Sequence, residues 1–149
     1  MTSKTRLLSI FLVSGFFLFL DRLLKYLSLH DWSTIHLVNR FLGWQPSLNA
    51  GLAFSLPMPA MITVVLTIPI IIVIIYLFFK NLHHFPLNFS LLMIALGALS
   101  NLFDRVVYRH TVDYFLVLTA ILNIADVMIT AGFILYLIGK KEQTDCYSE

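Results

Sequence analysis

Long runs of apolar residues dominate the chain and are separated by short polar segments. Four of these runs predict helices that cross a bilayer, because about 20 residues at ~1.5 Å each span its ~30 Å hydrocarbon core. They cover Leu7–Leu29, Met61–Phe79, Phe85–Arg105 and Ala120–Gly139. The pattern predicts an all-α membrane protein with four transmembrane helices, in a single integral membrane domain over residues 1–149.

The first run can be interpreted in a second way. Lys4 and Arg6 precede an apolar stretch that ends at Leu20, which is also the layout of a cleaved signal peptide. No cleavage motif of small residues follows, however, and the sequence continues with Asp21, Arg22 and more leucines. We therefore expect an uncleaved helix.

The connections between the runs differ in character. Asn81–His84 is short and polar, which predicts a tight hairpin between the second and third helices. His30–Pro59 contains Trp, Gly and Pro and alternates loosely between apolar and polar residues, so this loop region can hold a small β element at the membrane surface. Arg105–Thr119 connects the last two helices and could include a short interfacial helix.

Lysine and arginine predict the orientation. With four helices, both termini and the short hairpin link lie on one side of the membrane, and these segments carry five cations: Lys4, Arg6, Lys80, Lys140 and Lys141. Because positive loops stay cytoplasmic, we expect this side to be cytoplasmic. The loop 30–59 and the connection Arg105–Thr119 then face outward.

Composition agrees with a membrane protein and narrows its chemistry. The 149 residues are 59% hydrophobic and 12% charged, about half the charged fraction of a soluble domain. A net charge of +2 without a basic stripe gives no reason to expect a nucleic-acid partner. One Cys, five scattered His and the absence of HExxH or GxSxG motifs leave no pattern for a metal, a cofactor or a serine nucleophile.

Polar residues within or beside the apolar runs all fall near the outer face in this topology. They come from separate segments and are Asp21, Lys25, Asn101, Asp104, Arg105, Asp113, Asn123 and Asp126. A charge within the bilayer costs at least about 2.5 kcal/mol, so such residues usually face the bundle interior and serve a function. One alternative is purely structural, with Asp21–Lys25 and Asp104–Arg105 pairs joining the helices.

Asp113 and Asp126 have no cation next to them in the sequence, which favours a functional role. Two carboxyl groups in a partly desolvated site do not both ionise easily, and they share a proton. One can then activate water while the other, protonated, polarises a carbonyl group. This is the arrangement of aspartic proteases, and the sequence leaves open which Asp is the base.

Five short motifs in order resemble those of the bacterial lipoprotein signal peptidases, also called signal peptidase II. Asn49–Phe54 resembles NxGxAF, Asn101–Arg105 resembles GNxxDR, and Val112–Phe115 resembles VVDF. Leu122–Asp126 resembles FNxAD, and Asp21–Lys25 resembles DxxTK. The chain departs from these patterns at Leu24, Leu96, Ser100, Leu122 and the stretch Arg109–Thr111.

The resemblance implies a four-helix enzyme of the bacterial inner membrane with its active site near the periplasmic face. Such an enzyme cuts diacylglyceryl-modified prolipoproteins just before the lipidated Cys, and a globomycin-type inhibitor fills its pocket. The implied catalytic residues are Asp113 and Asp126, and the implied substrate-binding residues are Asn49, Gly51, Asn101, Arg105 and Asn123. Asp21, Lys25 and Asp104 are implied as supporting polar contacts. We expect membrane lipid as a partner, no cofactor, and a monomer.

Two other functions stay open at this point. The departures at Leu96, Ser100 and Arg109 are compatible with a diverged, non-catalytic relative that binds lipoproteins or lipids. The intramembrane Asp residues are also compatible with a small ion pathway, although the run Met61–Phe79 offers it no charged residue.

Overall fold

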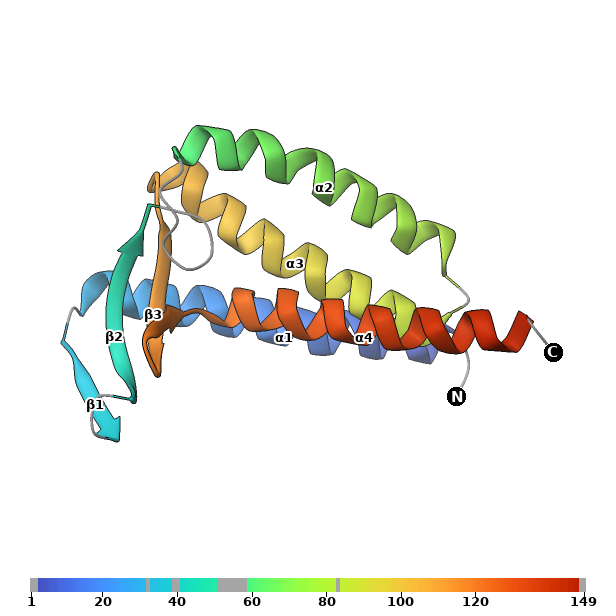
Figure 1. The fold of residues 1–149 in the computed structure, drawn as a ribbon, viewed down its shortest axis with the longest axis horizontal. Coiled ribbons are helices and arrows are strands. Elements are labelled where there is room, and N and C mark those ends of the chain that lie inside the picture. The colour runs from blue at the N-terminus through green and yellow to red at the C-terminus, as the bar shows by residue number, and fades with distance from the viewer. Residues whose placement is uncertain (1–2, 32, 39–40, 51–58, 83, 148–149) are drawn as a thin grey trace.

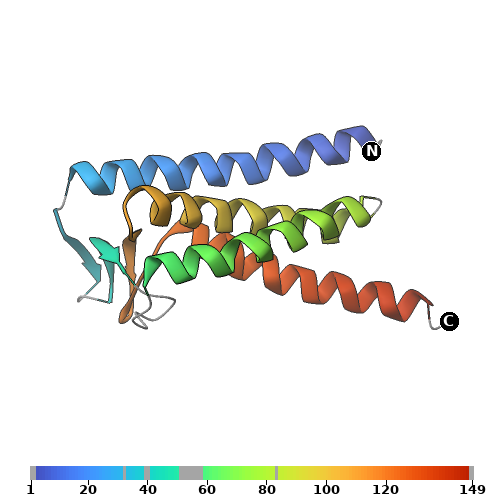
Figure 2. The ribbon, with the colours of Figure 1, turned by 90° about the horizontal axis from the view of Figure 1, so that it is seen from above.

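Four long helices and a small antiparallel sheet make up the protein, whose computed structural model describes residues 3–31, 33–38, 41–50, 59–82 and 84–147. The helices are α1 (Ser3–His30), α2 (Ala60–Lys80), α3 (Phe85–Val107) and α4 (Ile124–Tyr147). They lie side by side along the long axis, with the sheet across one end and both termini at the other (Figures 1 and 2). The prediction of a mostly helical fold is confirmed.

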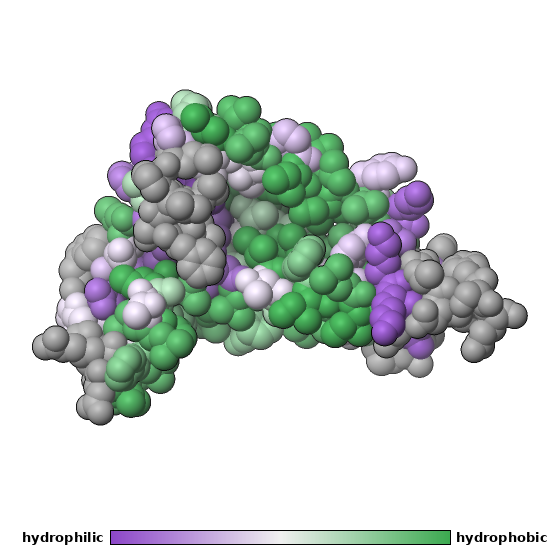
Figure 3. Space-filling view, viewed as in Figure 1, coloured by the Kyte–Doolittle hydropathy of each residue, from purple (hydrophilic) through white to green (hydrophobic). Residues whose placement is uncertain are grey.

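Among the described residues, three helices are long and apolar enough to cross a membrane, namely α1, α2 and α3. They contain the first three predicted runs. The middle of the molecule presents a broad hydrophobic surface in Figure 3, with polar residues gathered toward its two ends. Because lipid offers no hydrogen bonds to an exposed backbone, segments at this depth must satisfy their own amides, and helices do so.

The sheet contains β1 (Ile35–Val38), β2 (Leu42–Asn49), β3 (Thr111–Val117) and β4 (Ala120–Leu122), in that spatial order. The predicted β element in the loop 30–59 is thus confirmed by β1 and β2. The prediction that residues 105–119 could include an interfacial helix is wrong, because this segment contains β3 instead.

The start of the fourth helix was also placed wrongly. Ala120–Leu122 is apolar, which predicts that it belongs to the helix, but Leu122 pairs with Phe115 on β3. The helix begins only at Ile124, after Asn123.

Two irregularities shape the sheet and its connection to α3. The pairing of β2 with β3 shifts between Trp44 and Ser47, where Pro46 cannot donate a ladder hydrogen bond. Arg109, directly after α3, has a φ of 66°, a left-handed conformation that costs a non-glycine residue about 1–2 kcal/mol. The register nevertheless places Ser47 opposite Asp113, two positions along the ladder from Asn49 opposite Thr111.

α3 is the central helix and packs most closely on α4. A Cβ atom added at Gly97 would lie 2.6 Å from the Ala125 carbonyl oxygen, and one added at Gly132 would lie 2.8 Å from the Ser90 carbonyl oxygen. The two backbones therefore touch where glycine lacks a side chain, as is common between membrane helices. This contact fixes the first turn of α4, which carries Asp126, against α3.

Candidate active site

Asp113 on β3 and Asp126 on α4 meet at the end of the bundle that the sheet covers. Asn123 joins them: its Nδ2 donates to Asp113 Oδ1 at 2.6 Å, and its Oδ1 accepts a hydrogen bond from the Asp126 backbone N–H at 2.9 Å. Asn123 is fully buried and Asp113 is 2% exposed, whereas Asp126 is half-buried. The Asn123 carboxamide thus links the side chain of Asp113 to the backbone of Asp126.

Each carboxyl group accepts a second amide. Asn49 at the end of β2 donates its Nδ2 to Asp113 Oδ2 at 3.1 Å. Asn101 of α3 donates its Nδ2 to Asp126 Oδ1 at 2.8 Å. The structure therefore brings Asn49, Asn101 and Asn123, all predicted site residues, onto the two carboxyl groups.

Asp126 also belongs to the N-terminal cap of α4. The Asn123 side chain accepts from the Asp126 backbone N–H, and Asp126 Oδ2 accepts from the Asn123 backbone N–H at 3.3 Å. This reciprocal pair is a capping box, which satisfies two backbone donors that the helix start leaves free. It explains why the helix begins here, and it fixes Asp126 by its own backbone.

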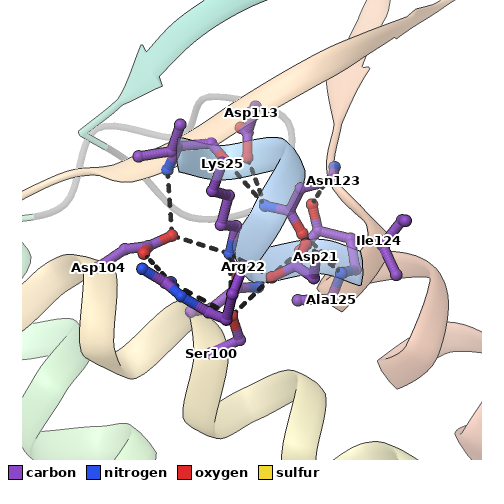
Figure 4. A network of polar contacts seen from close by, with 12 residues as sticks. Asp21, Arg22, Lys25, Ser100, Asp104, Asp113, Asn123, Ile124 and Ala125 are labelled. Carbon is purple, nitrogen blue, oxygen red and sulfur yellow. Dashed lines mark hydrogen bonds and ion pairs between the residues drawn. The ribbon is translucent and has the colours of Figure 1, made fainter. Parts of the chain in front are cut away.

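A buried charge cluster lies beside the two carboxyl groups and ties α1 to α3 (Figure 4). The Lys25 ammonium lies 2.9 Å from Asp21 Oδ2 and 2.8 Å from Asp104 Oδ2, and all three side chains are fully buried. Arg22, 30% exposed, adds a 2.5 Å ion pair to Asp104 Oδ1. Two cations thus balance two carboxylates, which offsets the cost of burying each of them.

The cluster corrects one expectation and confirms another. The Asp21–Lys25 pair forms as predicted. The prediction of an Asp104–Arg105 pair is wrong: within the described residues, the ion pairs of Asp104 are with Arg22 and Lys25. Arg105 is instead half-buried and close enough to Asp113 and Asp126 to interact with both electrostatically. Gly51, also predicted for the site, lies outside the described residues.

Two polar contributors were missed in the sequence. The Ser100 hydroxyl donates to Asp21 Oδ2 at 2.6 Å and accepts from Lys25 Nζ at 3.3 Å. The Tyr114 hydroxyl donates to Asp21 Oδ1 at 3.0 Å and accepts from the Ile124 backbone N–H at the start of α4. Tyr114 stays protonated because burial, and next the charge of Asp21, raise its pKa.

Asp21 completes the cap of α4 from a different helix. Its Oδ1 accepts from the Ala125 backbone N–H at 3.1 Å as well as from Tyr114. A carboxylate at a helix N-terminus is stabilised by the free N–H groups and by the helix dipole. One carboxylate oxygen of Asp21, Oδ1, therefore accepts hydrogen bonds at the first turn of α4, and the other, Oδ2, pairs with Lys25.

The pKa of Asp113 departs from its ordinary value near 3.8. Burial raises it to about 6, and the negative charge of Asp126 adds to the rise, while hydrogen bonds from Asn49 and Asn123 oppose it. Asp113 therefore keeps its proton to higher pH in the folded protein than in the unfolded chain. The pair is thus disposed to hold one proton, as an acid–base pair requires.

This shift predicts a pH-dependent gain in stability for Asp113→Asn. The unfolded chain loses the Asp113 proton first, so raising the pH from 4 to 6 destabilises the folded protein by up to about 3 kcal/mol, at about 1.4 kcal/mol per pKa unit. The amide cannot ionise and escapes this cost. We expect the variant to unfold at a higher temperature than the wild type at pH 8, in detergent, and at the same temperature near pH 4. An equal difference at both pH values would contradict the shift.

Comparison with known proteins agrees with this geometry. The profile of the family described as Signal peptidase (SPase) II matches residues 13–140. The lipoprotein signal peptidase of Caldanaerobacter subterraneus is 33% identical over 129 residues, covering 83% of this chain and 89% of its own. That of Clostridium novyi is 31% identical over 141 residues, covering 85% and 93%.

A solved structure has a similar fold. A bacterial membrane enzyme solved by the in meso method at 2.3 Å resolution superposes with a TM-score of 0.82 at 26% identity, over 91% of this chain and 89% of that one. The resemblance seen in the five motifs is therefore confirmed. Taken with the match over residues 13–140, these findings show that the chain belongs to the signal peptidase II family, the lipoprotein signal peptidases.

Proposed function

We propose that this chain is a membrane aspartic endopeptidase that removes the signal peptide from diacylglyceryl-modified prolipoproteins, cutting just before the lipidated Cys. Membership of the family supports the reaction. The observation that carries the proposal is the pair Asp113 and Asp126, joined through Asn123 at one end of the bundle.

The pair supplies both functions that peptide hydrolysis needs. The ionised carboxyl group takes a proton from water as the water oxygen attacks the scissile carbonyl carbon, and the protonated one donates its proton to the carbonyl oxygen. When the intermediate collapses, the C–N bond breaks and the amine of the lipidated Cys leaves with the proton taken from water. One hydroxyl group of the intermediate returns its proton to the carboxylate that acted as the acid. No metal or cofactor takes part in this scheme.

The remaining predicted residues have distinct roles in this proposal. Asn49, Asn101, Arg105 and Asn123 line the site, and Arg105 places a positive charge beside both carboxyl groups. For Gly51, outside the described residues, we keep the substrate-binding role that the family resemblance implies. Asp21, Lys25 and Asp104 support the site from the buried charge cluster. Since Asn101 and Asn123 already donate to the carboxyl groups, we infer that they orient the pair as well as the substrate.

We further propose that α4 is a fourth membrane span, within one integral membrane domain over residues 1–149. Its outward side exposes apolar residues, among them Val127, Phe133, Ile134, Leu137 and Ile138. Both termini then lie at the cytoplasmic face of the bacterial inner membrane, where positive residues belong. The site lies near the periplasmic face, open to water on one side and to lipid on the other. A lipid-modified Cys can enter it from the bilayer.

A cleavage assay tests the proposal directly. The purified protein, in detergent or proteoliposomes, is mixed with a prolipoprotein that carries diacylglycerol, and the product is followed by gel shift and by mass. We expect loss of the signal peptide, a new N-terminus at the lipidated Cys, and inhibition by globomycin. A protein that binds the substrate but leaves it uncut under all conditions would instead be a non-catalytic relative. We expect the active enzyme to run as a monomer in the same preparation.

A further inference from the structure

The orientation of the Asn101 carboxamide is fixed by a neighbour that can only donate. Asn101 Oδ1 accepts from Lys25 Nζ at 2.9 Å, and an ammonium group has no acceptor. The amide nitrogen must therefore be on the other side, where it donates to Asp126 Oδ1 at 2.8 Å. Turning the carboxamide over would place two donors against each other.

Lys25 is itself held in one position. Its ammonium contacts Asp21, Asp104, Ser100 and Asn101 at 2.8 to 3.3 Å, and its side chain is fully buried. Four partners from α1 and α3 leave it little freedom to reorient. The direction of the hydrogen bond from Asn101 to Asp126 therefore follows from the charge cluster.

The second oxygen of Asp126 also faces a donor that cannot turn over. Asp126 Oδ2 accepts from the Asn123 backbone N–H, whose position is set by the start of α4. Both oxygens of Asp126 are thus met by N–H groups in fixed orientations, at a helix N-terminus. Each of these features stabilises the ionised form of a carboxyl group.

Asp113 has a different set of partners. Its Oδ1 faces Asn123 Nδ2, but its Oδ2 faces the Asn49 carboxamide of β2 at 3.1 Å. The Asn49 donor comes from the end of a strand, so it lacks the helix dipole that adds to the donors around Asp126. Asp113 is also the more deeply buried member of the pair.

We propose that Lys25, acting through Asn101, is a positioning residue that fixes Asp126 as the ionised base of the pair, so that the shared proton lies on Asp113. The inference rests on the proposed aspartic mechanism and adds the assignment of its two members. The other titratable groups facing the pair are Asp21 on α1, Asp104 and Arg105 on α3, and Tyr114 on β3. The charges of Arg105 and Lys25 act on both carboxyl groups, so the distinction rests on the hydrogen bond from Asn101 to Asp126.

The test compares the pH profiles of kcat/KM for two matched variants, Asn101→Ala and Asn49→Ala, on the lipidated prolipoprotein. Each removes one amide from one carboxyl group. Hydrogen bonds to a charged group contribute about 1.5–3 kcal/mol, so losing the one to the base moves the acid limb to higher pH by about one unit or more. We expect this shift for Asn101→Ala, and an acid limb in its wild-type position for Asn49→Ala. The reverse pattern, or no movement in either variant, would overturn the assignment.

A second pair of variants tests Lys25 itself. Lys25→Met alone leaves Asp21 and Asp104 with one cation, so it is combined with Asp104→Asn to keep the cluster neutral. We expect this double variant to shift the acid limb in the same direction as Asn101→Ala. The control is Arg22→Met combined with the same Asp104→Asn change, which also keeps the cluster neutral but removes a guanidinium that donates to Asp104 and Ser100. Its acid limb should stay in place.

The two levels of the proposal fail in different ways. If the wild-type enzyme does not cut the lipidated substrate at any pH, the proposed function is wrong. If it cuts but the folded Lys25→Met/Asp104→Asn variant keeps the wild-type acid limb, Lys25 is only a structural residue and the inference is overturned.

Discussion

Replacing either Asp113 or Asp126 by Asn is expected to lower kcat by at least about a thousandfold, because residues that act as a unit each carry most of the catalytic effect. An amide can neither take a proton from water nor give one to the carbonyl oxygen. It is close in size to the carboxyl group, so the fold is kept, although one N–H donor beside each new amide loses its acceptor, because both oxygens of each carboxyl group accept hydrogen bonds. The measurement is single-turnover cleavage of the lipidated prolipoprotein.

A matched control separates this effect from a general loss of charge. Asp31 is an exposed Asp beyond the end of α1, where its side chain accepts from the Ser33 backbone N–H. Asp31→Asn should cleave at the wild-type rate. Thermal unfolding shows that the inactive variants are folded. More than a tenth of wild-type activity in either Asp113→Asn or Asp126→Asn would rule out the aspartic mechanism.

The second large loss of activity is expected from a substitution at Gly97, which lies well before Asp113 and Asp126 in the sequence. An added Cβ would lie 2.6 Å from the Ala125 carbonyl oxygen and 2.9 Å from Ile129 Cγ1, so α4 must move away from α3. Ala125 immediately precedes Asp126, and a displacement of 1 Å in a catalytic group can cost about a hundredfold in rate. We expect Gly97→Ala to lower kcat by about that factor and to lower the unfolding temperature.

Two other glycines supply the controls. Gly132→Ala meets the Ser90 carbonyl oxygen at 2.8 Å, so it disturbs the same helix pair but two turns away from Asp126. It should destabilise the protein with a smaller loss of rate. Gly15→Ala has no atom within 4 Å of its added Cβ and should change neither property. If Gly97→Ala and Gly132→Ala lower kcat equally, the contact does not act through the position of Asp126.

The helices could be predicted because lipid imposes a simple rule on the sequence. Long apolar runs in the sequence correctly predicted α1, α2 and α3. The order of these helices then placed the polar residues near one end of the bundle. The start of α4 was placed wrongly because Ala120–Leu122 is as apolar as the helix that follows. The signal that could have corrected it is Asn123 followed three residues later by Asp126, a capping box.

The partners of the charged residues were harder to predict. Asp104 and Arg105 are adjacent in sequence, yet neighbours on a helix point in different directions, and Asp104 pairs with Arg22 and Lys25 of another helix. Packing between helices decides such pairs, and a single sequence does not encode it visibly. Ser100 was noted only as a departure from the family pattern, and its hydroxyl proves to bridge Asp21 and Lys25.

The most direct test of the shared site is a crystal structure of the protein with a globomycin-type peptide bound. We predict that one polar group of the peptide lies within hydrogen-bond distance of both Asp113 and Asp126, with Asn123 still joining them. A peptide that contacts only one of the two carboxyl groups, or that binds away from both, would contradict the central claim.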